Sequence, residues 1–572
     1  MNSKRYITAI MMLSMMTLGS CNDEFLDRLP LDGLTDETYW TNENNVRTFT
    51  WSFYTTFFPG YSAGYDLGWG GYFSGQSLND DFAPGNPATF TTVVPASGGG
   101  WSFTQVRKIN LYIDRIQRVP MSEEAINHWT GVGRFLRGLE YADLVKSFGD
   151  VPWYGQVLEE DSPELYRPRD SRTAVMDNVL ADFQFAAEHV RSEDGDTGPK
   201  GLIINRDVVL AFMSRVFLFE GTFLKYHDID QAKATAYLEA AKWAAQEVMN
   251  SGYAVGPDYR ALFTSEDLDG NAEIIMYRQY NTAQVMHSLM SYVNREPQTG
   301  ASKDLIDAYL MDDGLPTSLS SDYMGDKTID DVMANRDPRM HATFVSELRL
   351  NGDPDLAFPN YSTSGYAVHK FLNEELKDEP AGLQNQNITD APVIRYGEVL
   401  LNYAEAAAEL GTLSQQDLDI SINMLRKRNG INMPNLEVIG GLPAVNGETY
   451  TDPDRDPEVS PLLWEIRRER RIELTMEGFR LDDLLRWKKL EYTDNPSRPD
   501  INRGAWVNKA DYDSALPNVV IEGGGTAGYI RPAASQAYRV FDNDRVYLSP
   551  IPLDQIKLYQ DQGVELVQNP GW

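Results

Sequence analysis

The feature that most restricts the fold of this sequence is a set of stretches in which apolar residues recur at the 3.6-residue period of an α-helix. Such stretches predict helices that pack through one apolar face. Glycines stand where three of them would end, because a helix often ends in a left-handed residue: Gly221, Gly411 and Gly430. The apolar positions that define the faces are Val175, Val179, Phe183, Ala186 and Val190; Val208, Phe212, Val216 and Phe219; Leu238, Ala241, Ala245 and Val248; Leu400, Tyr403, Ala407 and Leu410; Ile422 and Leu425.

The spacing of these helices predicts a repeat of helix pairs. From Val208 onward they come at intervals compatible with a unit of about 34 residues, the tetratricopeptide length. Alanines around Ala404 and Ala407 would let two helix backbones approach closely. The expected fold is mainly α: a tetratricopeptide-like scaffold of about four helix pairs, with long irregular insertions and a few short strands.

Two long segments interrupt the helical pattern. Residues 51–103 and 251–394 are rich in glycine and aromatic residues and are too long for ordinary connections. Loops of this kind often carry function. The expected organisation is a signal peptide at 1–20, a tether at 21–40, an N-terminal part at 41–250 with the aromatic loop 51–103, a ligand-site insertion at 251–394 and a C-terminal part at 395–572.

The N-terminus has the layout of a lipoprotein signal. Lys4 and Arg5 precede an apolar run, and small residues lead to Cys21, the one cysteine of the chain. We expect Cys21 to be lipidated, with a free buried cysteine as the alternative. The run is too short to span a bilayer, so the predicted membrane attachment is the lipid anchor alone. The formal net charge of −33 argues against nucleic acid as a partner.

The common catalytic motifs are absent from the sequence, which has no HExxH, no Walker A and no GxSxG segment. A facing carboxylate pair, as in a glycosidase, stays open but cannot be assigned to residues. The alternating acids from Asp452 to Glu458 predict a solvated loop, because Pro457 occupies the position where an EF-hand needs glycine. No cofactor is expected, and a structural calcium ion is left open and unplaced. The helix-like stretch 462–490 interleaves arginine with glutamate and is interpreted as a salt-bridged structural element.

The aromatic insertions supply the candidate ligand site. Sugar rings stack their C–H faces on indole and phenol rings, while their hydroxyl groups need polar partners. The alternative for each ring is a place in the core, which we assign to Trp51, Trp101 and Phe103. The candidate ligand-binding residues are Trp69, Tyr72, Asn79, Asp80 and Asp81 in the first insertion and Tyr280, Tyr292, Asn294 and Arg295 in the second.

The order of short motifs along the chain resembles the SusD/RagB family of surface nutrient-binding lipoproteins. The resemblance covers nearly all of the sequence. After Cys21 it is carried by Phe25-Leu26-Asp27, Thr38-Tyr39-Trp40, residues 137–141 and 146–152, residues 335–339, Gly365-Tyr366, Lys370-Phe371, Arg395-Tyr396, Glu398, residues 400–406, Ile422-Asn423, Arg426, Arg428, residues 469–471, Glu473-Leu474, Glu477-Gly478, Arg480, Asp483-Leu484, Arg486-Trp487, residues 550–552 and residues 568–571.

This resemblance implies a cell-surface protein of the outer membrane that binds oligosaccharides without cleaving them. It also implies a role as the lid of a SusC-like TonB-dependent transporter. Family ligand sites lie on the insertions at positions that vary, so no family motif assigns the site residues. Uptake of peptides is the main alternative; a glycoside hydrolase and a pure assembly scaffold are the others.

Overall fold

The computed structural model describes residues 36–65, 69, 71–73, 78–193, 201–356, 359–533 and 539–572. The predicted signal peptide and Cys21 lie outside the described residues. None of the helices among the described residues combines the length and apolar character that a membrane crossing requires.

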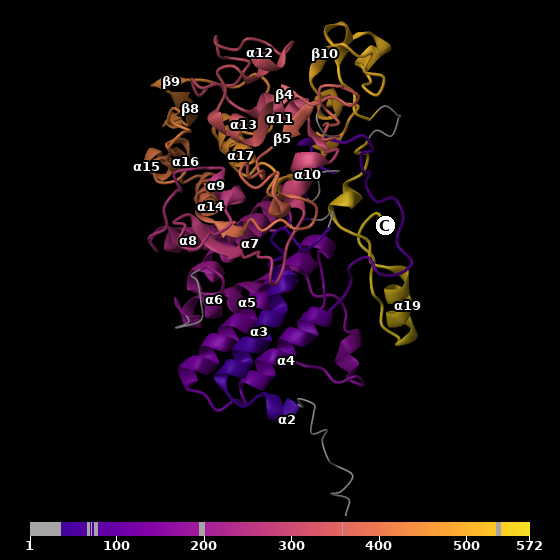
Figure 1. Cartoon of the computed structure of the whole chain (residues 1–572). Helices are drawn as coiled ribbons and strands as arrows, with labels where there is room; N and C mark the ends of the chain where they lie inside the picture. The colour runs from indigo at the N-terminus through magenta and orange to yellow at the C-terminus, as the bar shows by residue number, and fades with distance from the viewer. Residues whose placement is uncertain are drawn as a thin grey trace, which may run out of the picture.

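Long helices form the N-terminal half of the scaffold, which occupies the lower and middle parts of the molecule in Figure 1. Most begin at a side-chain cap: Ser122, Ser171, Asn205 and Asp230 each accept a hydrogen bond from the backbone N–H three residues later. The helices are α2 (Asp36–Tyr39), α3 (Glu43–Phe57), α4 (Thr104–Ile116), α5 (Glu123–Phe148), α6 (Arg172–His189), α7 (Arg206–Tyr226) and α8 (Gln231–Met249).

Consecutive helices pack in pairs, as the periodicity predicts: α4 with α5, α5 with α6 and α7 with α8. The prediction that α7 ends at Gly221 is wrong, because the helix continues to Tyr226. Gly221 lies instead where α7 crosses α8, and a Cβ there would come within 2.7 Å of Leu238 Cγ. The glycine therefore permits close helix packing and does not terminate the helix.

The scaffold resumes after the second insertion and packs on the first half through α14, which contacts α7 and α8. Gly411 and Gly430 follow the predicted helices with φ of 69° and 80°. The stretch 462–490 is two helices and not one, because a turn through Gly478, at φ 84°, separates them. The helices of this half are α14 (Tyr396–Glu409), α15 (Gln415–Asp419), α16 (Ile422–Arg426), α17 (Pro461–Glu473) and α18 (Arg480–Arg486).

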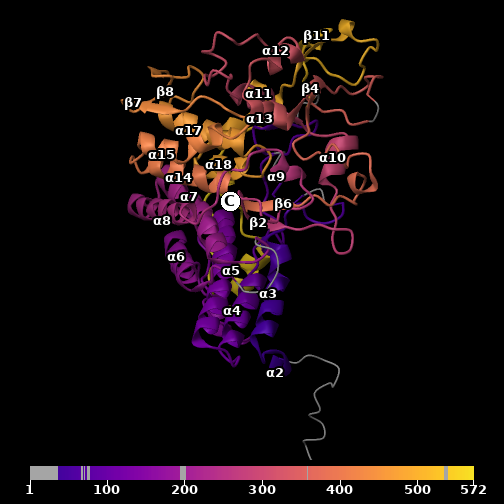
Figure 2. The same cartoon turned by 60° about the vertical axis from the view of Figure 1, so that its left-hand side comes forward.

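The second insertion forms the upper part of the molecule with short elements (Figure 2). Its helices are α9 (Ala261–Thr264), α10 (Leu289–Arg295), α11 (Lys303–Ala308), α12 (Ile329–Met333) and α13 (Pro338–Thr343). Antiparallel strand pairs tie it together: β1 (Phe82–Ala83) with β3 (Gly300–Ala301), β2 (Ile274–Arg278) with β6 (Ala391–Arg395), and β4 (Phe344–Leu348) with β5 (Tyr366–Val368). The β1–β3 pair joins the first insertion to the second.

The C-terminal region adds small sheets at the top and an arm that returns along the scaffold (Figure 1). Its strands are β7 (Glu437–Ile439), β8 (Leu442–Val445), β9 (Glu448–Thr449), β10 (Trp506–Asn508) and β11 (Ala527–Tyr529), and its last helix is α19 (Leu553–Asp561). The 3₁₀ helices in the described part of the chain are η2 (Pro163–Tyr166), η3 (Pro380–Gly382), η4 (Leu490–Thr493), η5 (Pro499–Asn502), η6 (Lys509–Asp511), η7 (Glu522–Gly524) and η8 (Asp544–Tyr547).

Among the described residues, one large apolar core lies among the scaffold helices, a second lies mainly within the insertions, and a small third cluster contains Leu484, Leu490, Tyr492 and Tyr547. A buried group of charged side chains, here called the ion network, links the two parts. It contains five basic and five acidic residues: Arg339, Lys370, Arg395, Arg426 and Arg428, with Glu273, Asp337, Glu469, Glu473 and Glu477. Because the charges balance, each buried ion has opposite charge beside it.

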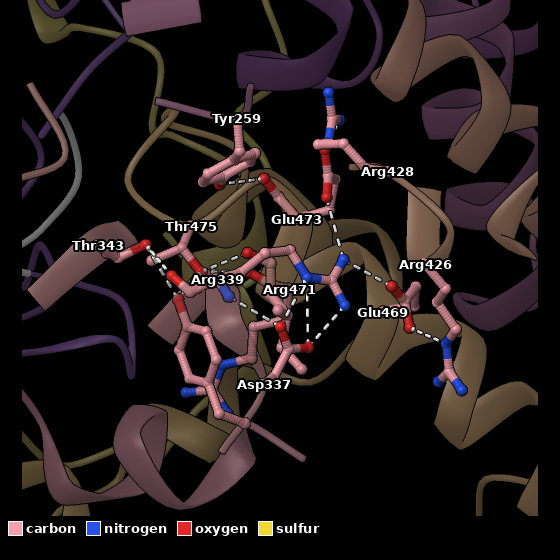
Figure 3. Close-up of polar contacts among 12 residues, drawn as sticks. Tyr259, Asp337, Arg339, Thr343, Arg426, Arg428, Glu469, Arg471, Glu473 and Thr475 are labelled. Atoms are coloured by element: carbon pink, nitrogen blue, oxygen red, sulfur yellow. Dashed lines mark hydrogen bonds and ion pairs between the residues drawn. The ribbon is translucent and has the colours of Figure 1, made fainter. Parts of the chain in front are cut away.

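Two glutamates of α17 are central to the ion network (Figure 3). Glu473 lies 2.9 Å from Arg395 Nη1, 2.9 Å from Arg428 Nη2 and 3.0 Å from Arg339 Nη1. Glu469 lies 2.6 Å from Arg339 and 2.8 Å from Arg426. Since Arg339 belongs to α13 and the glutamates to the scaffold, these contacts fix the insertion on the helices.

Three smaller predictions have mixed outcomes. Trp101 is buried, but Trp51 is 49% exposed on α3, so its assignment to the core is wrong. The acidic loop is not simply solvated, because Asp452 is buried against Arg468 and Asp456 accepts a hydrogen bond from Tyr492. The stretch 462–490 is salt-bridged as expected, because Glu465 pairs with Arg468 and Arg470 pairs with Asp483 of α18.

Candidate functional site

The aromatic residues of the two insertions lie together, although they are more than 200 positions apart in the chain. The rings of Trp69 and Tyr292 have centroids 4.4 Å apart. Tyr61 contacts Tyr72 on one side, at 4.7 Å, and Tyr280 on the other, at 6.2 Å. The structure thus brings the predicted aromatic residues of both segments into one cluster.

Most of these rings are buried and their polar groups are occupied. Trp69, Tyr72 and Tyr280 are 3%, 6% and 2% exposed. Trp69 Nε1 donates to Ser288 Oγ at 3.3 Å, Tyr72 Oη donates to the Pro392 carbonyl at 2.5 Å and Tyr280 Oη donates to the Ser62 carbonyl at 2.7 Å. Their ring faces therefore pack in the second apolar core, and their contact with a ligand stays a prediction.

Asn79, Asp80 and Asp81 are also buried. The Asn79 side chain accepts a hydrogen bond from the Asp81 N–H at 3.1 Å, whereas Asp80 and Asp81 face arginines of α17 and α18. Asp80 accepts two hydrogen bonds from Arg480, both of 2.7 Å, and Asp81 accepts one from Arg471 at 2.7 Å. Burial by itself would raise the pKa of Asp80, but Arg471 and Arg480 hold that pKa well below its usual value. These carboxylates orient arginines, and nothing brings them into direct contact with Tyr280 or Tyr292.

The remaining predicted residues lie on or beside α10. Asn294 is buried and donates to the Lys377 carbonyl at 2.8 Å, so its amide is occupied. Tyr292 and Arg295 are only partly buried. The hydroxyl oxygen of Tyr292 accepts a hydrogen bond from the Thr299 N–H at 2.9 Å, and Arg295 Nη2 donates to Asp378 at 2.7 Å. Of the predicted residues, these two keep side-chain surface in contact with solvent.

Tyr65 adds an exposed ring close to α10. Its side chain is 61% exposed, and a bridge between Gly64 and His287 holds its loop against the segment that leads into α10. Burial and the nearby charge of Glu296 raise the pKa of Tyr65. We call Tyr65, Tyr292, Arg295 and Glu296 the α10 surface. The sequence places Tyr65 among many aromatics, and no periodicity separates it from its buried neighbours.

The described residues contain no group of histidine, cysteine and carboxylate side chains that could hold a metal ion. A cavity of about 360 Å³ lies between α5, α7 and α18. Glu140 lines it, and burial, with the nearby charge of Asp143, raises the pKa of Glu140 to about 7. A second cavity, of about 380 Å³, lies beside α17 and α18.

One protein family matches the C-terminal half of the chain. The family described as the SusD family matches residues 272–572. Among curated proteins, a SusD-like protein of Formosa agariphila, P38, is 21% identical over 84% of this chain and 91% of its own length. A SusD-like protein of Bacteroides ovatus is 22% identical over 84% of each chain.

A similar fold occurs among solved structures. One described as a SusD-like carbohydrate binding protein of Bacteroides fragilis has 22% sequence identity and a TM-score of 0.69, and the match covers 91% of this chain and 99% of the other. At this level of identity the likeness concerns the fold. It agrees with the expected mainly helical architecture.

Proposed function

Because this chain belongs to the SusD family, we propose that it is a non-catalytic lipoprotein, anchored at the cell surface through Cys21, that captures oligosaccharides as the lid of a SusC-like TonB-dependent transporter. The similarity to a solved structure described as a SusD-like carbohydrate binding protein supports the choice of ligand class. A lipid anchor with more than one acyl chain would keep the protein on the outer membrane, since one chain binds only marginally.

The observation that carries the proposal is the α10 surface. Tyr65 presents an exposed ring and Tyr292 a partly exposed one, on which the C–H face of a sugar could stack. Arg295 and Glu296 supply a donor and an acceptor for hydroxyl groups beside the rings. The buried cluster beneath them, from Trp69 to Tyr280, holds the surface in place, because its rings contact Tyr292 from below.

In the proposed capture step, one or two sugar rings stack on the α10 surface and no bond of the ligand is broken. Each stacked ring contributes about 1 kcal/mol beyond burial. Together with burial of the ring faces and hydrogen bonds to the hydroxyl groups, we expect a total binding free energy of about 4–8 kcal/mol, which corresponds to dissociation constants of about millimolar to micromolar. Delivery to the transporter then requires release, which weak stacking permits.

The test is affinity electrophoresis of residues 22–572 in gels loaded with plant, host and microbial polysaccharides. We expect one polysaccharide to retard the migration of the wild-type protein, and we expect the protein to leave the length of that polysaccharide unchanged. Tyr65→Ala and Arg295→Ala should each weaken that retention about tenfold, the effect of losing about 1.4 kcal/mol. Trp51→Ala removes an exposed ring of the scaffold and should leave retention unchanged. Equal retention of Tyr65→Ala and wild type would remove the α10 surface from the proposal.

The transporter partnership needs a separate measurement. Lipidated protein purified from its own outer membrane should carry a large β-barrel protein with it. If no barrel accompanies the protein, the lid role fails while glycan binding can still stand. Release of reducing sugar during incubation with the retained glycan would instead favour a hydrolase, and retention of peptides in place of glycans would favour peptide uptake.

A further inference from the structure

The cavity beside α17 and α18, here called the arginine cavity, lies apart from the α10 surface. Residues of α11, α17, α18, η4 and η5 line it, so the second insertion, the scaffold and the C-terminal region all contribute. Its volume of about 380 Å³ falls in the lower part of the range for small-ligand pockets. It combines a charged wall, which can form hydrogen bonds, with aromatic side chains, on which a ring can stack.

The charged wall is a row in which arginines and aspartates alternate. Arg498 Nη2 donates to Asp304 at 2.8 Å, and the other oxygen of Asp304 lies 2.9 Å from Arg471 Nη2. Arg471 in turn contacts Asp81, and Arg480 donates to both oxygens of Asp80. At one end of the row, Arg498 also stacks on the Tyr492 ring at 4.4 Å.

The row carries no excess charge, since Arg471, Arg480 and Arg498 are matched by Asp80, Asp81 and Asp304. It still has hydrogen-bonding capacity. Arg480 uses Nε and Nη2 for Asp80 and Arg498 uses Nη2 for Asp304, so within the described residues Nη1 of each arginine has no hydrogen-bond partner. A neutral ligand with adjacent hydroxyl groups can accept from such nitrogens and donate to the carboxylates beside them.

An aromatic ring also faces this space. Trp464 of α17 lines the cavity and is partly exposed. Its Nε1 donates to Asp452 Oδ2 at 3.2 Å, which fixes the orientation of the indole. Asp452 is itself paired with Arg468, so the support of the ring is also buried and charged. The cavity therefore offers an oriented ring and a polar wall, the two features that a pyranose needs.

We propose that the arginine cavity binds one pyranose unit of a neutral glycan, as a second site in addition to the α10 surface. The proposal rests on the glycan-binding function proposed above and extends it to a new location. An anionic sugar fits less well, because the aspartates match the arginines one for one and the whole chain carries a formal charge of −33. Asp80 and Asp81 act here as positioning residues, since they hold Arg480 and Arg471 from behind the wall.

The test uses saturation-transfer NMR with the methyl glycosides of glucose, galactose, mannose and xylose as probes. At least one probe should bind the wild-type protein in the millimolar range. Its affinity should fall about tenfold in Trp464→Ala and in Arg498→Gln, each of which removes one stated contact. Arg498 is 31% exposed, so Arg498→Gln tests the wall even where loss of the indole impairs folding. Trp243→Ala, which removes a 44% exposed ring of α8, serves as the matched control.

The outcomes separate this site from the α10 surface. Loss of binding in the Trp464 and Arg498 variants, with binding retained in Tyr65→Ala, supports the arginine cavity. Absence of saturation transfer from all four probes, or equal affinity in wild type, Trp464→Ala and Arg498→Gln, overturns it. Loss in Tyr65→Ala alone also overturns it and leaves the proposed function intact. If no polysaccharide is retained in gels but a probe binds through Trp464, the proposed capture function fails and the cavity stands.

Discussion

Glu473 is the residue whose removal should most clearly weaken the join between the insertion and the scaffold. Glu473→Gln keeps the size of the side chain but removes a charge that three arginines share: Arg339, Arg395 and Arg428. The ion network would then hold five positive and four negative groups in a fully buried place. Breaking a buried ion pair in this way costs about 3–5 kcal/mol. With an unfolding entropy of roughly 1.1 kcal/mol/K for a chain of this length, the melting temperature should fall by about 3–5 °C.

Differential scanning calorimetry near pH 7 measures this shift. Glu188→Gln is the control, because that side chain is 76% exposed and its nearest basic atom, in His189, is 3.9 Å away; its melting temperature should stay within about 0.5 °C of wild type. A Glu473→Gln protein that melts within 1 °C of wild type, roughly a quarter of the expected shift, would refute the reasoning.

The same variant has a defined pH dependence. Burial would raise the pKa of Glu473, but Arg428, Arg395 and Arg339 lower it to about 2. The folded pKa thus lies below the unfolded value, so the stabilisation is complete above about pH 4.5 and is lost as pH falls towards 2. The difference in melting temperature between wild type and Glu473→Gln should therefore be constant from about pH 7 to pH 5 and shrink below that.

Two further substitutions test other parts of the fold. Burial raises the pKa of Glu140 to about 7 in the folded state, so the folded state binds this proton more tightly than the unfolded state does. The stability that Glu140 contributes is therefore lost as pH rises from about 4.5 through 7. In the same calorimeter, Glu140→Gln should raise the melting temperature at about pH 8, and the gain should shrink towards pH 5. An equal gain at both pH values would contradict that assignment. Gly221→Ala would gain about 1 kcal/mol in an exposed helix, but here the new Cβ would lie 2.7 Å from Leu238 Cγ, and we expect a net loss of about 1–3 kcal/mol in chemical denaturation. A more stable Gly221→Ala protein would show that α7 and α8 can separate without cost.

The sequence predicts the scaffold well because periodic burial is a local property. Val179, Phe212 and Ala241 of the predicted faces are buried in α6, α7 and α8, whereas Val216 and Phe219 of the α7 face are only partly buried. Several residues of the motifs that carry the family resemblance lie in the ion network: Arg339, Arg395, Arg428 and Glu473. Such residues identify the fold because a buried charge tolerates few replacements, and for the same reason they say little about a ligand at the surface.

The ligand site is harder to predict because an aromatic residue in a loop can either be buried in the core or be exposed at the surface. Trp69 and Tyr65 lie four positions apart in one glycine-rich segment, yet one is 3% and the other 61% exposed. The difference depends on Tyr292 and Phe73, which cover Trp69 and come partly from a segment far along the chain. Composition identifies the right segments, and only the tertiary contacts separate the supporting rings from the exposed ones.

The segment after residue 548 forms hydrogen bonds with residues 95–169 in the N-terminal part of the chain. Leu553 N–H donates to the Pro95 carbonyl at 3.0 Å, and Asn569 donates to the Phe148 carbonyl at 3.0 Å. Arg169 donates to the Val567 carbonyl at 2.7 Å and to Asn569 Oδ1 at 2.6 Å. The C-terminal end of α5 and the loops before α4 and α6 thus form hydrogen bonds with residues that are synthesised more than 380 positions later. During synthesis from the N-terminus these helices can form early, but the hydrogen bonds to residues 553–569 can form only after those residues have been synthesised.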